Sequence, residues 1–341
     1  MKLRETIFLV CGIVIGIGAA QLFRKASPNG TVDEVATESG KRSPEPRLSG
    51  RIAKKDDPNN PSLGELMEEV MLMEAAADDA ELRAYLEENS YSREAVVAAA
   101  LLSGDIAYLV DAAERYPDDP HVQLLVLDRE DFPGGRDGWY ARFKRSQPDN
   151  MLASMLHGYH LLSQGSTTEG LDQLRTGSRQ SNYNDFASES SLAMESALIQ
   201  LGRSPLEAKI RSVAFPTTLA KQLQVRPDSE FIKAIEATEN EDERQELVLV
   251  GVALGNQMSQ GQAGKNTINR LVGFSMEQRF LMQLDPQLES PALSAPPEEM
   301  MEEIQLEANR LRDQTVEFSE HYLDLNEQQM MHYLDRLRSA G

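Results

Sequence analysis

Two histidines, His157 and His160, are the side chains whose type and spacing best fit metal chemistry in this sequence. Residues three apart on a helix differ by about 60° in direction, so both imidazoles would lie on one face. Such a pair can bind zinc when other side chains complete the coordination shell. A buried, hydrogen-bonded pair of neutral histidines fills the same space without a metal. The other histidines, His121, His321 and His332, stand in no ligand motif. We therefore predict a structural pair, no bound metal and no other cofactor.

Other motifs for catalysis are missing from the sequence. The single cysteine, Cys11, lies inside an apolar run, so paired thiolates and disulfides within the chain are impossible. Gly264-Lys265 is followed by Asn266, where a phosphate-binding loop needs Ser or Thr. The carboxylates follow helical faces and form no recognisable acid/base pair. We predict that the protein is not an enzyme, and a metal-dependent hydrolase using the two histidines above is the alternative.

Aromatic side chains offer a second kind of site, one that binds a protein. Trp139 and Tyr140 form the main aromatic cluster with Phe143, and Tyr159 lies between the two histidines. Tryptophan and tyrosine are frequent among the residues that dominate interface energetics. We predict that Trp139, Tyr140 and Tyr159 contact a partner. Packing between helices is the alternative for the same residues.

The charge of the chain is unevenly distributed and argues against one class of partner. Residues 1–62 hold 10 Lys+Arg and 7 Asp+Glu, a net charge of +3. Residues 63–341 hold 24 Lys+Arg and 48 Asp+Glu, a net charge of −24. A body this acidic repels phosphate backbones, so we predict no nucleic-acid partner.

The N-terminus carries a segment suited to a membrane. Residues 6–23 contain no charged side chain and are nearly all apolar, and basic residues flank both ends. Such a helix spans about 27 Å, enough for the hydrocarbon core of a bilayer. We predict that residues 1–25 are a signal anchor that crosses the cell membrane once and leaves the body extracytoplasmic, in the periplasm. The alternative is a signal peptide that is cleaved after Ala20.

Residues 26–62 read as a flexible basic linker. Proline and glycine recur along them, and no apolar period survives across the segment. Its lysines and arginines could lie on anionic headgroups, but a solvated spacer explains the composition as well. We predict that this linker separates the anchor from the folded body.

The body is predicted to be helical throughout. A capping residue followed three positions later by Glu or Gln marks repeated helix starts. These pairs are Ser62/Glu65, Asp78/Glu81, Ser166/Glu169, Ser204/Glu207, Asn240/Glu243 and Ser275/Gln278. No stretch alternates apolar and polar residues as a half-buried strand does. The predicted helices cover residues 63–76, 79–88, 93–103, 105–115, 119–129, 137–145, 150–164, 168–180, 187–201, 205–213, 217–224, 229–237, 241–260, 276–284, 298–323 and 327–339.

Three helix exits resemble one another in sequence. They begin at Arg115, Arg145 and Arg179 and run into Asp- and Asn-containing turns, at intervals of 30 and 34 residues. Between the last two lie an Ala-, Leu- and Tyr-bearing helix that ends in Gly165 and a second, Leu-rich helix. Over roughly residues 92–200 this pattern resembles tetratricopeptide repeats. The resemblance implies an α-solenoid of stacked helix hairpins.

These expectations combine into one domain plan and one function. Residues 63–285 form a tetratricopeptide-like array, and residues 286–341 form a Pro-rich connection and a C-terminal helical pair. Because solenoids expose long concave surfaces, we expect a membrane-anchored scaffold that binds other proteins. The alternative is an envelope chaperone or assembly factor that holds clients on its acidic body and methionine-bearing C-terminal helices.

Overall fold

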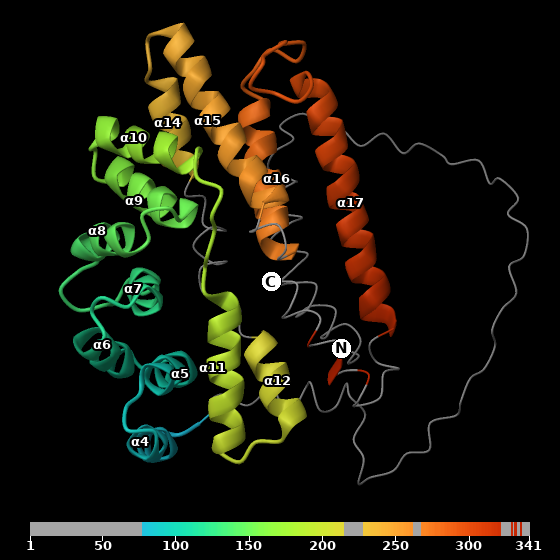
Figure 1. The fold of residues 1–341 in the computed structure, drawn as a ribbon. Helices are drawn as coiled ribbons and strands as arrows, with labels where there is room; N and C mark the ends of the chain where they lie inside the picture. Colours follow the sequence, from blue (N-terminus) through green and yellow to red (C-terminus); the bar gives the residue numbers. More distant parts are fainter. Residues whose placement is uncertain are drawn as a thin grey trace, which may run out of the picture.

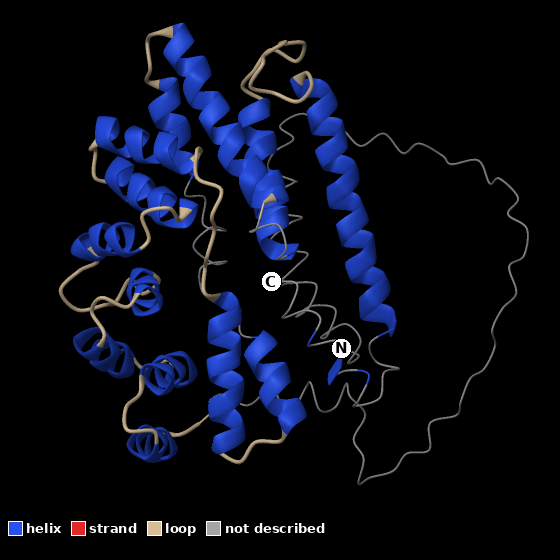
Figure 2. Cartoon of the chain, viewed as in Figure 1, coloured by secondary structure: helices blue, strands red, loops and turns tan. Residues whose placement is uncertain are grey.

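The computed structural model describes residues 77–214, 228–261 and 267–321, together with Gln329, Met331, His332 and Asp335. Every regular element within them is an α-helix, which confirms the all-α class (Figure 2). The predicted anchor and linker and the predicted helices 63–76 and 217–224 lie outside the described residues, as does most of the predicted helix 327–339. None of the described helices combines the length and the apolar character that a membrane crossing needs.

The first seven described helices form a row in which each helix packs against the next (Figure 1). They are α4 (Asp79–Glu88), α5 (Arg93–Ser103), α6 (Ile106–Arg115), α7 (Pro120–Leu127), α8 (Asp137–Ser146), α9 (Met151–Ser163) and α10 (Thr167–Gly177). The later helices are α11 (Ala187–Gln200), α12 (Pro205–Ala214), α14 (Asp228–Glu236), α15 (Glu241–Gln260), α16 (Thr267–Leu281) and α17 (Pro297–His321). Apart from α16, the bounds agree with the prediction to within three residues.

Side chains at helix starts explain this agreement. At α4 the Asp78 carboxylate accepts from the backbone N–H of Glu81 at 2.8 Å, and the Glu81 carboxylate accepts from that of Asp78 at 3.0 Å. Ser204 and Asn240 likewise accept from the backbone N–H three residues onward, at 3.2 and 3.1 Å. These bonds satisfy N–H groups that a helix leaves unpaired at its first turn.

Two predicted capping pairs are wrong. Ser166 precedes α10 but makes no capping hydrogen bond through its side chain. Ser275 lies inside α16, which begins at Thr267 rather than at residue 276. Gly273 makes this part of α16 a poor helix former, yet it allows very close packing on α15. A Cβ at Gly273 would lie 2.5 Å from the backbone nitrogen of Ser259, so tertiary contact stabilises a turn of helix that local signals do not predict.

The pair α9–α10 is held at short range by two glycines. A Cβ on Gly158 would lie 2.9 Å from Leu174, and a Cβ on Gly170 would lie 2.8 Å from Leu162. Each glycine therefore accommodates a leucine of the facing helix. Small and large residues interlock across this hairpin, and its two helices pack with their backbones close together.

After α10 the chain leaves the row and turns back. Residues 178–186 lead to α11, which packs against α5 and lies beside α7 (Figure 1). Asn150, the N-cap of α9, fixes this return. Its amide donates to the carbonyl of Asn184 at 2.8 Å and accepts from the backbone N–H of Asn184 at 3.2 Å. The sides of α5 and α7 that face α11 are therefore covered by the chain itself.

The buried apolar residues divide into two clusters. One joins α4–α7 to α11 and α12, and the other joins α7–α10 to α14–α17. Trp139 of α8 packs against both clusters. Near the C-terminal end, Asp335 lies 2.5 Å from the Nζ of Lys209, a buried lysine on α12.

Candidate functional site

The structure places both histidines of the predicted pair at the contact between α8 and α9. The Nε2 of His160 lies 3.2 Å from the Oδ1 of Asp137, and its ring stacks on Tyr140 with the centroids 4.1 Å apart. The His160 side chain is 14% exposed, whereas that of Asp137 is 83% exposed. His160 is therefore built into a helix interface through its ring, with one edge bound to a surface carboxylate.

His157 lies one turn earlier on the same helix and is half-buried. Its Nδ1 is buried and has no hydrogen-bond partner among the described residues. Burial lowers the pKa of His157, and the neighbouring His160 and Lys144 lower it further. Burial also lowers the pKa of His160. Both imidazoles are therefore neutral at pH 7. In the described part of the chain, no group of three His, Cys, Asp or Glu side chains is placed to hold a metal ion.

A serine and a lysine also meet at this contact. The Nζ of Lys144 donates to the Oγ of Ser154 at 2.6 Å, and that hydroxyl donates to Gln180 at 2.6 Å. Burial lowers the pKa of Lys144, which is what a lysine base requires. However, Ser154 is 0% exposed and its hydroxyl is committed to Gln180. This network braces the start of α9 and presents no nucleophile to a substrate.

The three aromatic residues predicted to contact a partner differ in accessibility. Tyr140 and Tyr159 are 8% and 7% exposed and belong to the larger apolar cluster. Trp139 is partly buried, meets Phe132 edge-on at 5.8 Å, and carries the Arg142 guanidinium 4.8 Å from its ring centre. Of the three predicted residues, Trp139 therefore keeps the most accessible side chain.

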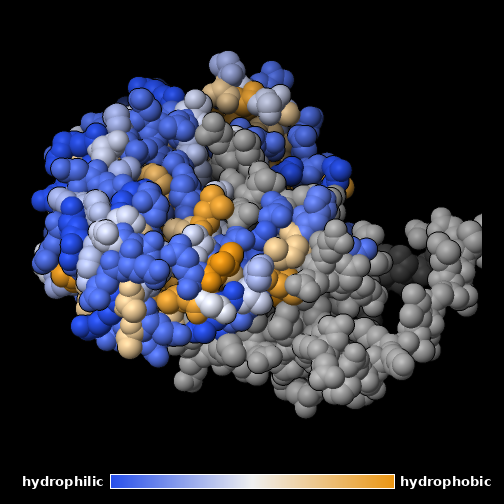
Figure 3. Space-filling view, turned by 60° about the horizontal axis from the view of Figure 1, so that its bottom comes forward, coloured by the Kyte–Doolittle hydropathy of each residue, from blue (hydrophilic) through white to orange (hydrophobic). Residues whose placement is uncertain are grey.

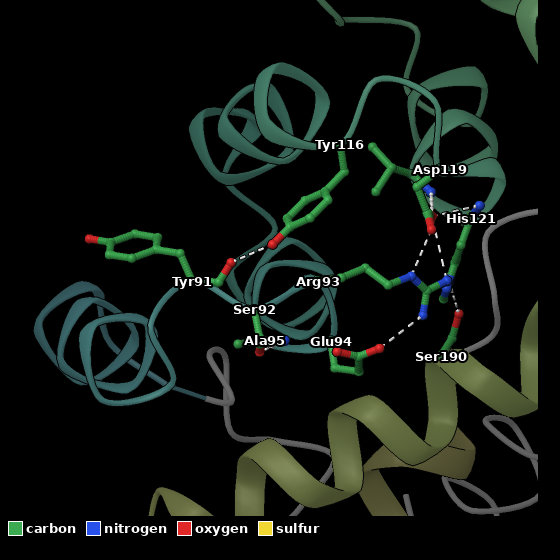
Figure 4. Close-up of polar contacts among 10 residues, drawn as sticks. Tyr91, Ser92, Arg93, Glu94, Ala95, Tyr116, Asp119, His121 and Ser190 are labelled. Atoms are coloured by element: carbon green, nitrogen blue, oxygen red, sulfur yellow. Dashed lines mark hydrogen bonds and ion pairs between the residues drawn. The ribbon is translucent and has the colours of Figure 1, made fainter.

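A second polar cluster, which the sequence analysis did not predict, joins α5, α7 and α11 (Figure 4). The Nε2 of His121 on α7 and the Oγ of Ser190 on α11 are hydrogen-bonded at 2.8 Å. Asp119 accepts from the Nε of Arg93 on α5 at 2.7 Å and from the backbone N–H groups of His121 and Val122 at 3.0 Å each. Serine, histidine and aspartate are the residue types of a hydrolytic triad.

The geometry of this cluster does not form a triad. The Asp119 carboxylate binds Arg93 and caps α7, while the Nδ1 of His121 is buried with no partner among the described residues. His121 and Ser190 are 1% and 3% exposed, and Phe186 stacks on the imidazole with centroids 5.1 Å apart. Burial lowers the pKa of His121 to about 4, so it stays neutral. The cluster is a structural lock that fixes α11 to the row.

Little in the sequence could have revealed this lock. His121 and Ser190 are 69 residues apart and belong to no common motif. The one local signal is Asp119-Pro120, a capping residue followed by proline at the first helical position, which places His121 in the first turn of α7.

The face of α11 turned away from α5 carries the most notable surface feature. Four large apolar side chains are exposed in the described residues, and two of them, Leu192 and Ile199, lie on this one helix at 51% and 44% exposure. The others, Met282 and Leu306, lie on separate elements. The space-filling view shows apolar side chains gathered amid hydrophilic ones on the face that it presents (Figure 3).

Comparison with protein-family models, with curated proteins and with solved structures gave no match for this chain.

Proposed function

We propose that the protein is a membrane-anchored, extracytoplasmic helical scaffold that binds another protein. The observation that carries this proposal is the pair Leu192 and Ile199, two turns apart on α11 and both exposed. Two large apolar side chains exposed on one face of a helix gain free energy when a partner covers them, and exposed apolar side chains that share a face mark interaction sites.

The arrangement of the helices supports the same proposal. Consecutive helices from α4 to α10 pack side by side, and α11 packs against α5 and is fixed to α7 by the His121–Ser190 lock. A surface built on braced helices changes little in shape when a partner binds, which lowers the entropic cost of association. His121 and Ser190, and likewise Lys144 and Ser154, are hydrogen-bonded to each other within the fold.

The membrane part of the proposal rests on residues 6–23 and their basic flanks. Its test is a protease-protection experiment on cells that produce the full chain. We expect residues 63–341 to resist protease added to intact cells and to be digested once the outer envelope is opened. Digestion by protease confined to the cytoplasmic side would contradict an extracytoplasmic body.

The binding part is tested by photo-crosslinking in those cells. A photoreactive amino acid is placed singly at Leu192, Met282, Leu306 and Glu114, an exposed polar position that serves as the control. A scaffold gives one or a few discrete adducts at an apolar position and none at Glu114. A smear of many adducts at all apolar positions would instead favour the chaperone alternative. Absence of adducts at every position would refute protein binding.

A further inference from the structure

The exposed side of α11 is one continuous stripe. Glu189, Leu192, Ser196 and Ile199 follow one another at intervals of three or four residues, which places them on one helical face, and all four are exposed. The opposite face is buried, with Met194, Ala197 and Leu198 at 2% exposure or less. We call these four exposed residues the α11 stripe. Its apolar members are separated by two turns, about 10.5 Å along the helix axis.

The charge beside the α11 stripe is negative. Lys209, the single lysine of α12, is paired with Glu195 of α11 at 3.6 Å and with Asp335 at 2.5 Å. Arg203, just beyond the end of α11, is paired with Glu81 at 3.1 Å. These two cations are therefore matched by carboxylates, whereas α11 itself carries no lysine or arginine and adds Glu189 to its exposed face.

The body as a whole increases this negative potential. Residues 77–214 hold 22 Asp+Glu and 13 Lys+Arg, a net charge of −9. A partner that covers the apolar pair must therefore place its own charges against an acidic surrounding. Complementary potentials speed association and suppress wrong partners.

We infer that the α11 stripe binds an amphipathic helix of a partner protein, one that presents lysines or arginines beside an apolar stripe. This inference rests on the proposed scaffold function and specifies its partner. Apolar residues at i, i+3 or i+4, and i+7 of the partner helix span the 10.5 Å or so between Leu192 and Ile199. Basic residues flanking them meet Glu189 and the acidic surroundings.

Two other occupants fit the stripe less well. A second copy of this chain would bring Glu189 and the same acidic surroundings of both copies together, at a net charge of −21 per chain. Anionic lipid headgroups would be repelled for the same reason, and an electrostatic membrane contact requires lysine and arginine at the surface. A basic helix avoids both penalties.

The test uses the full chain in phosphatidylcholine nanodiscs and three labelled peptides, each about 18 residues long, or five turns. The first is an amphipathic Leu/Lys helix, the second has Glu in place of Lys, and the third has the first composition scrambled so that no apolar face remains. Fluorescence anisotropy measures each affinity, with empty nanodiscs as the blank. We expect the Leu/Lys helix to bind about tenfold or more tightly than either of the others.

Variants locate the binding. Leu192→Ser/Ile199→Ser should weaken binding of the Leu/Lys helix about tenfold or more. Glu189→Lys, which leaves the apolar pair intact and guards against misfolding of the double variant, should weaken it about threefold. Leu306→Ser, which removes the most exposed leucine of α17 at 71%, is the matched control and should change nothing.

The competing outcomes are distinguishable. Equal affinity in all variants, or an equal loss with Leu306→Ser, overturns the inference. Self-association of the chain that the α11 variants abolish would also overturn the inference. Binding to phosphatidylglycerol vesicles that the same variants abolish would do so as well. A discrete photo-crosslink at Leu306 or Met282 with none at Leu192 would keep the scaffold function and refute this surface, whereas failure of every crosslink would refute the function itself.

Discussion

Glu277 offers the most quantitative test of the physical account of this fold. It lies on α16 with 2% exposure and faces α15, where its carboxyl group accepts from Asn256 at 3.3 Å and from Ser259 at 3.4 Å. Burial raises the pKa of Glu277 from its ordinary value of 4.5 to about 7, because two long hydrogen bonds do not offset the loss of water. The neighbouring Glu303 of α17 raises it further.

The sign of the pH dependence follows directly. Below pH 4.5 the carboxyl is protonated in both the folded and the unfolded chain, so it has no effect on the free energy of unfolding. Between pH 4.5 and 7 the unfolded chain releases the proton and the folded chain keeps it, so stability falls as pH rises. The two pKa values differ by about 2.5, and each unit corresponds to about 1.4 kcal/mol, so the loss approaches about 3.5 kcal/mol well above pH 7.

The perturbation that removes this loss is Glu277→Gln, which keeps the shape and an acceptor oxygen but cannot ionise. We expect the variant to be more stable than the parent by about 3 kcal/mol at pH 8 and by about 1 kcal/mol or less at pH 5. For a domain of this size, the gain at pH 8 should raise the melting temperature by about 5–10 °C. Thermal unfolding of the full chain, followed by far-UV circular dichroism at both pH values, measures it.

The control for this experiment is Glu302→Gln, a change on the exposed side of α17 at a carboxylate that does not contribute to the raised pKa of Glu277. It should alter stability by less than about 1 kcal/mol, because a solvated carboxylate interacts weakly. A Glu277→Gln protein that is no more stable than the parent at pH 8, or whose advantage is the same at pH 5 and pH 8, would show that burial does not raise the pKa of Glu277.

Three further predictions concern single side chains, each measured as the change in the free energy of unfolding. His160→Gln should cost about 1–2 kcal/mol by removing the ring stack and the bond to α8, and a chelator should leave the melting temperature of the parent unchanged. Asn150→Ala should cost about 3 kcal/mol, because it removes the cap of α9 and leaves the backbone carbonyl and N–H of Asn184 unpaired. Ser166→Ala is its control and should cost less than about 0.5 kcal/mol, because Ser166 makes no capping bond. Gly255→Ala should cost about 2 kcal/mol or more because its Cβ would lie 2.6 Å from the α16 backbone, whereas Gly138→Ala, where a Cβ meets no atom, should be neutral or stabilising.

The candidate sites show how far residue types alone can be interpreted. The spacing of His157 and His160 correctly placed both on one helix, but it did not indicate that Tyr140 and Asp137 of α8 surround His160. Those partners come from a different helix, and their positions depend on how α8 crosses α9. The His121–Ser190 lock had no sequence signal at all, because its two members meet only when α11 returns to the row.

Local sequence signals are enough to set where most of the described helices begin and end. Capping at Asp78, Ser204 and Asn240 acts through hydrogen bonds spanning three residues, so its outcome does not depend on the rest of the fold. The all-α class follows from the same local signals.

Which faces of those helices are buried, and which residues cover them, depends on the tertiary packing. The first turns of α16, the raised pKa of Glu277 and the exposed stripe of α11 all depend on contacts between residues far apart in the chain. Gly273 lets α16 approach α15 closely, that approach removes water from Glu277, and the packing of α11 on α5 leaves Leu192 and Ile199 outside. Burial is a property of neighbours in space, and a helical period in one segment specifies an apolar face without specifying what will cover it.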